Sequence, residues 1–140
     1  MSARRIAPRE LAAVAEATVL LATMRVAVPR VPFKRLAAWT GLEPGDAATD
    51  TTPAADAVGL AVARAAAHVP WNATCLMQAL AGARMLRRRH VPATVHLGVA
   101  KDATEPDGLA AHAWLRAGVA VLTGVNGSHR FTPVAAYHLR

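Results

Sequence analysis

The stretch that decides the fold is TCLMQALAGARMLRRR, residues 74–89, which reads as one helix with an apolar side. Thr74 is a good N-cap residue, so Cys75 falls in the first helical turn. Leucine and alanine then recur at helical spacing up to Leu86. The following His90-Val91-Pro92 ends the pattern, because proline cannot continue a helix.

The chain downstream of this helix has the pattern of an antiparallel sheet. Residues 93–100 alternate between apolar and small or polar side chains, which is typical of a strand. Residues 111–116 and 119–123 read as two further strands, joined by a tight turn at Ala117-Gly118. The tail from residue 125 onward has no clear pattern.

The chain upstream of Cys75 is mainly helical in pattern. We expect helices over residues 8–28, 33–39 and 54–68, and a loop over residues 41–53, which are rich in Gly, Pro, Asp and Thr. Helices followed by a sheet predict an α+β fold. We expect a single domain over residues 1–140, with a helical N-terminal extension (1–50) and a catalytic core (54–137).

The composition is that of a globular, basic protein. Of the 140 residues, 54% are apolar, and the net charge is +7. Such an excess serves solubility first, and next the binding of an acidic peptide or protein surface. No nucleic acid is expected as a partner, because no aromatic residue is interleaved with the basic run at Arg84 and Arg87–Arg89 for base stacking.

The single cysteine, Cys75, excludes an internal disulfide and favours a reducing, cytoplasmic setting. The apolar segment 11–28 is interrupted by Glu16 and Arg25, so no transmembrane segment is expected. A peripheral membrane contact stays open as an alternative.

Cys75 and His112 are the residues with catalytic potential. A helix N-terminus stabilises the thiolate, which is the nucleophilic form of cysteine, and its N–H groups can hold an oxyanion. The alternative is a buried structural cysteine. Strand alternation puts His112, Trp114 and Arg116 on one face, so His112 points at an open surface if the other face meets the core.

Three motifs in this order resemble the cysteine peptidases that remove leader peptides in lasso-peptide biosynthesis. They are TCL at residues 74–76, VPATVHLGV at 91–99 and AHAWL at 111–115, and the likeness covers about residues 70–135. The resemblance implies a transglutaminase-like, papain-like fold with Cys75 as nucleophile and His112 as its base. The two side chains are then expected to form a close pair, at roughly 3–4 Å.

The resemblance also implies partners and no cofactor. The substrate would be a precursor peptide, and the chain leaves no room before residue 70 for a leader-binding module, so a small separate leader-binding protein is expected. An ATP-dependent lasso cyclase would act after cleavage. No metal is expected, since the His and Cys residues show no paired ligand spacing.

The chain departs from the family pattern at the third catalytic residue, which is an Asp on the strand after the histidine. No Asp or Glu follows Asp107. A turn at Ala117-Gly118 would place Thr123 opposite His112, and Asn126 is the second candidate for orienting the imidazole. A backbone carbonyl, or a loop carboxylate from Asp102, Glu105 or Asp107, is the remaining alternative.

Three further residues are candidates for binding the substrate: Trp71 and Asn72 before the nucleophile, and Trp114 beside His112. Packing explains Trp114 equally well, and for Asn72 a turn at the helix start is the favoured interpretation. Two other functions stay open beside the peptidase. One is an acyl transferase or different peptidase on the same fold, and the other is a peptide-binding module whose catalysis is weakened by the missing acid.

Overall fold

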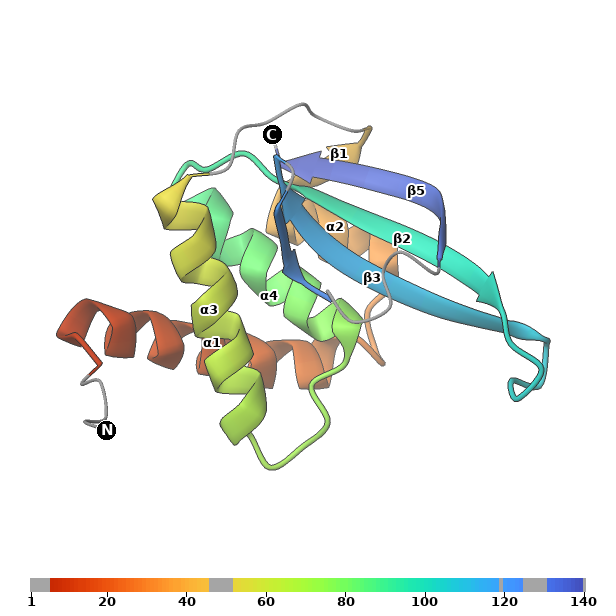
Figure 1. Ribbon diagram of the computed structural model, residues 1–140, viewed down its shortest axis with the longest axis horizontal. Coiled ribbons are helices and arrows are strands. Elements are labelled where there is room, and N and C mark those ends of the chain that lie inside the picture. The colour runs from red at the N-terminus through yellow and green to blue at the C-terminus, as the bar shows by residue number, and fades with distance from the viewer. Residues whose placement is uncertain (1–5, 46–51, 119, 125–130, 140) are drawn as a thin grey trace.

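The chain forms a helical layer packed on an antiparallel sheet, as a computed structural model shows (Figure 1). The structure describes residues 6–45, 52–118, 120–124 and 131–139. The helices are α1 (Pro8–Ala27), α2 (Phe33–Thr40), α3 (Pro53–His68) and α4 (Cys75–Arg88). The strands are β1 (Leu42–Pro44), β2 (Thr94–Lys101), β3 (Leu109–Ala117), β4 (Ala120–Thr123) and β5 (Thr132–Leu139). The predicted α+β class is confirmed.

Helix α4 begins where its capping chemistry predicts. The Thr74 side chain accepts a hydrogen bond from the backbone N–H of Met77 at 3.3 Å. The side chain of Gln78 donates to the carbonyl of Ala73 at 2.8 Å and fixes the chain that enters the helix. The first bond satisfies an N–H group that an uncapped helix start would leave without a partner, and Cys75 is the first helical residue.

The sheet has the strand order β1-β5-β2-β3-β4, with every neighbouring pair antiparallel. Two of its strands differ from the sequence prediction. The expected loop over residues 41–53 contains β1, and the tail without a clear pattern contains β5. Both are strands because β5 pairs with β1 on one side and β2 on the other, a long-range constraint that local periodicity does not reveal.

The register of the β3–β4 hairpin corrects the predicted one. Ala117 pairs with Ala120, Leu115 pairs with Thr123, and an irregularity lies between Leu115 and Arg116. Thr123 therefore does not lie opposite His112. The turn begins one residue later than predicted, at Gly118, whose φ of +59° suits a tight hairpin turn. The bulge then shifts β4 by a further residue.

Helix α1 packs into the same core as the elements that follow it. Its Leu21 and Met24 are fully buried in one cluster with Leu80 of α4 and Leu115 of β3. Its polar side forms ion pairs with the other helices. Glu10 pairs with Arg64 of α3 at 3.0 Å, and Glu16 pairs with Arg88 and Arg89 at the end of α4. No helix in the described ranges is long and apolar enough to span a membrane.

Gly82 lets α4 approach β3 closely. A Cβ atom added there would lie 2.6 Å from Cδ2 of Leu115, which is fully buried and cannot easily move. The absence of a side chain at this position therefore sets the distance between helix and sheet.

We predict that Gly82→Ala destabilises the protein, because overpacking costs about 1–3 kcal/mol and outweighs the gain of about 1 kcal/mol in helix propensity. Denaturant unfolding would measure the change. The matched control is the same substitution in a Leu115→Ala background, where the clash is gone and Gly82→Ala should be neutral or stabilising. An equal loss in both backgrounds would contradict the account.

Candidate active site

Cys75 lies in the first turn of α4, partly buried at the margin of the core. The first N–H groups of a helix have no partner within the helix. At this helix start the Thr74 hydroxyl takes up only the N–H of Met77. The helix dipole places partial positive charge beside the sulfur. The N–H groups of this helix start can bind the oxyanion that forms when a cysteine nucleophile attacks a carbonyl group.

His112 lies in β3 with one ring nitrogen already engaged. Its Nε2 is 2.8 Å from the carbonyl oxygen of Gly124. A carbonyl can only accept a hydrogen bond, so Nε2 carries the hydrogen and Nδ1 of the neutral ring is left as the basic atom. The backbone just after β4 thus fixes both the orientation and the tautomer of the imidazole.

Two aromatic rings pack against the His112 ring. The Phe131 ring lies 4.9 Å from it and the Trp114 ring 5.8 Å, both stacked, and His96 stacks on the far side of Trp114. Gly98 makes room for this, since a Cβ atom there would lie 2.8 Å from the Trp114 ring. His112 is therefore held in place by packing as well as by its hydrogen bond.

The faces of β3 divide as alternation predicts. Ala113, Leu115 and Ala117 are buried in the core, so His112 lies on the opposite face. That face is less open than expected, because Trp114 is only 6% exposed.

Cys75 and His112 lie at the same end of the α4–β3 contact. Gly82 meets Leu115, and the chain leaving α4 enters β2 at Thr94, which pairs with Arg116. The start of α4 thus points toward the His112 end of β3. Cys75 is seven residues before Gly82, about 10 Å at 1.5 Å per residue, and His112 is three before Leu115, about 10 Å along the strand.

No hydrogen bond joins the Cys75 sulfur to His112 or to any other group in the described ranges. The close pair expected from the sequence therefore stays a prediction.

The comparison with protein families decides the class of the protein. The model of the transglutaminase-like superfamily matches residues 7–136, almost the whole chain. The chain belongs to the transglutaminase-like superfamily. No curated protein and no solved structure matches it closely enough to add to this assignment. Members of the superfamily are typically cysteine peptidases or acyltransferases, which sets the coarse activity class.

In this transglutaminase-like domain, the described acceptor for the His112 ring is the backbone oxygen of Gly124 and not a side chain. Thr123 is 4% exposed, and its hydroxyl has no hydrogen-bond partner within the described ranges. Its methyl group faces Gly82 of α4, on the core side of the sheet. Thr123 thus does not orient His112 here, because the hairpin register turns it to the other face. Asn126 lies outside the described residues.

Two of the three loop carboxylates, Asp102 and Asp107, accept hydrogen bonds from residues of the same loop. Asp102 accepts hydrogen bonds from the backbone and side chain of Thr104, and Asp107 accepts one from the backbone of Leu109. Glu105 is exposed. The described contacts give none of the three to His112.

The three candidate substrate-binding residues occupy different places. Trp114 is stacked between His112 and His96. Trp71 packs against the core, with the guanidinium of Arg25 5.0 Å from its ring centre and its indole N–H buried without a partner in the described ranges. Asn72 is exposed beside the start of α4. Their roles in binding substrate stay predictions.

Sequence reasoning did not single out Gly124, although its carbonyl is the acceptor for His112. Gly124 has a φ of +71°, and a Cβ atom there would lie 2.5 Å from the carbonyl oxygen of Ala113 and 3.2 Å from Nε2 of His112. A glycine directly after a strand was the one available signal, since it favours left-handed backbone.

We predict that Gly124→Ala destabilises the protein by at least about 1–2 kcal/mol, the usual cost of left-handed backbone for an L-residue. Displacing the acceptor of His112 should also lower the rate of any reaction that uses the imidazole, by roughly ten- to a hundredfold. Thermal unfolding and the ¹⁵N chemical shifts of the His112 ring would measure the two effects.

Thr123→Val is the matched control, because it changes the neighbouring residue without touching the Gly124 carbonyl. It should leave the His112 signals unchanged and keep or raise stability, since it removes a buried hydroxyl without a partner. Unaltered His112 signals in Gly124→Ala would refute the assigned role of this carbonyl.

Proposed function

We propose that the protein is a cysteine peptidase that removes the leader from a lasso-peptide precursor before macrocyclisation. The proposal rests on the local environments of its two reactive groups, Cys75 and His112. Cys75 occupies a capped helix start, and the Nε2 hydrogen bond of His112 to Gly124 leaves Nδ1 free to accept a proton. The resemblance of the motifs TCL, VPATVHLGV and AHAWL supports the specific substrate.

The reaction would run through a thioester. Nδ1 of His112 accepts the thiol proton, and the Cys75 sulfur attacks the carbonyl carbon of the scissile peptide bond. The imidazolium then protonates the leaving amine, and water, deprotonated by the same imidazole, hydrolyses the thioester. Thioester formation and thioester hydrolysis each pass through an oxyanion. The N–H groups in the first turn of α4 would stabilise both of them.

The proposal requires the two side chains to meet near one edge of the described sheet. Pairing between β3 and β4 stops at Leu115–Thr123, so among the described strands only β2 pairs with the part of β3 that holds His112. Catalytic contacts are often long without substrate and tighten when it binds.

A neutral orienter is compatible with a cysteine nucleophile. The carbonyl of Gly124 stabilises an imidazolium less than a carboxylate does. The thiolate–imidazolium pair should accordingly be less populated than with an aspartate in this position. Cysteine tolerates this better than serine, because the thiol ionises more readily.

Acyl transfer to an amine is the second candidate, because the same pair of residues can form the same thioester. The superfamily includes both activities. The acceptor, water or an amine, distinguishes them, and product mass would identify it.

We predict that Cys75→Ala abolishes cleavage of the precursor, with a rate lower by about a thousandfold or more, while the fold is retained. Mass spectrometry of a precursor incubated with the protein and a leader-binding partner would follow the reaction, and circular dichroism would check the fold. Cleavage at the normal rate by this variant would exclude the mechanism.

We also predict that cleavage depends on a separate leader-binding protein. The described elements all belong to the helical layer and the sheet around the candidate site, and none of them forms a further leader-reading unit. Initial rates at low precursor concentration, with and without the partner, would test this. Cleavage at the full rate without the partner protein would contradict the two-protein arrangement.

A further inference from the structure

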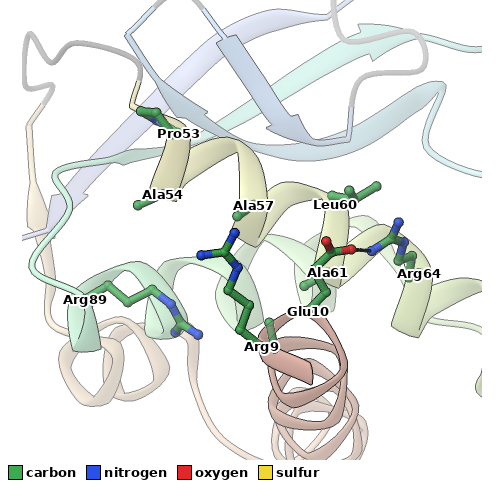
Figure 2. A pocket seen from close by; sticks show the side chains of 10 residues that line it. Arg9, Glu10, Pro53, Ala54, Ala57, Leu60, Ala61, Arg64 and Arg89 are labelled. Atoms are coloured by element: carbon green, nitrogen blue, oxygen red, sulfur yellow. Dashed lines mark hydrogen bonds and ion pairs between the residues drawn. The ribbon is translucent and has the colours of Figure 1, made fainter. Parts of the chain in front are cut away.

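A cavity of about 530 Å³ lies between the starts of α1 and α3 and the end of α4. Figure 2 shows it bounded by Arg9 and Glu10 of α1, by residues of α3, and by Arg89, just after α4. Arg89 is fourteen residues from Cys75, about 21 Å along the helix. The cavity is thus distinct from the candidate active site.

Among the described residues around the cavity, the cationic side chains outnumber the carboxylates. Arg64 pairs with Glu10 at 3.0 Å, and Arg89 pairs with Glu16 at 2.8 Å. Arg9 lies between these two pairs and makes no ion pair or hydrogen bond with any residue the structure describes. Its guanidinium reaches toward Ala57 across the cavity, as Figure 2 shows. Within the part of the chain that the structure describes, Arg9 therefore offers the cavity a positive charge that no carboxylate opposes.

The rest of the lining is aliphatic. It consists of Ala13 of α1 and of Pro53, Ala54, Ala57, Leu60 and Ala61 of α3. Leu60 is 48% exposed, which is high for a leucine and leaves an apolar rim at the opening. One side chain that combines a carboxylate with a neighbouring aliphatic group would match both features, since guanidinium binds carboxylates with two parallel hydrogen bonds.

We propose that this cavity is an exosite for the peptide substrate, which binds a Glu or Asp side chain that lies next to an aliphatic residue. This inference rests on the proposed peptidase function. An extended peptide rises about 3.3 Å per residue, so the acidic residue would lie at least about six residues from the bond that is cut. The net charge of +7 favours the approach of such an acidic segment.

The test uses two small probes that differ in one group, N-acetyl-Glu-Leu-amide and N-acetyl-Gln-Leu-amide. Titration into the isotope-labelled full chain, followed by NMR of the alanine methyl groups, would report binding at the cavity. We expect the carboxylate probe to shift the signals of Ala13, Ala57 and Ala61 at millimolar concentration. The amide probe should bind about tenfold more weakly or worse, because it lacks the charge-assisted hydrogen bonds.

Arg9→Gln should weaken binding of the carboxylate probe by about tenfold or more. Arg30→Gln is the matched control, since it removes the same charge from an exposed residue after the other end of α1 and should leave binding unchanged. Equal binding of both probes, equal effects of both variants, or no shift at the three alanines would overturn the proposal.

A parallel titration of Cys75→Ala separates the exosite from the catalytic proposal. The variant should bind the carboxylate probe as the parent chain does, because the cavity does not include Cys75. In the parent chain, binding of the carboxylate probe without cleavage of any precursor peptide would leave the cavity as a carboxylate site and refute the peptidase function alone.

Discussion

The close packing of α4 on β3 is the constraint on which the rest of the structure depends. Gly82 allows Leu115 to fill the space between helix and strand, and both residues lie in the interior with Val62 of α3 nearby. Because the helix runs in the same sense as the strand, the start of α4 and the His112 end of β3 come to one end of the domain. A capped cysteine and a strand histidine, 37 residues apart in sequence, are thereby brought into one region.

The elements predicted from the sequence are those that local chemistry determines. Pro8 and Thr74 mark helix starts through their own backbone and capping properties, and the structure begins α1 and α4 within a residue of these positions. Helix α3 begins at Pro53, one residue before the predicted start. The strands β1 and β5 were missed, since each exists through a partner distant in the sequence. The hairpin register was wrong because the position of the turn and a single bulge decide it, and neither leaves a clear pattern in side-chain types.

The candidate site was predictable in part for the same reason. Cys75 and His112 have reactive side chains, so they can be identified as candidates from the sequence. The acceptor for His112 is a main-chain oxygen at Gly124, which the sequence cannot distinguish from any other carbonyl. The Phe131 ring stacked on His112 comes from a segment whose pattern predicted no element, and its position follows from pairing of β5 with β2. Among the described residues, the hydrogen-bond acceptor and the stacked ring of His112 thus depend on the assembled sheet.

The central claim is that His112 activates Cys75, and the alkylation rate of Cys75 by iodoacetamide at neutral pH tests it without any substrate. Thiolates react and thiols do not, so the rate follows the thiolate fraction. The account predicts that His112→Ala slows alkylation by roughly tenfold, since the thiolate loses its imidazolium partner, whereas His68→Ala, at the exposed end of α3, leaves the rate unchanged. Equal rates in the parent chain and in His112→Ala would contradict the account.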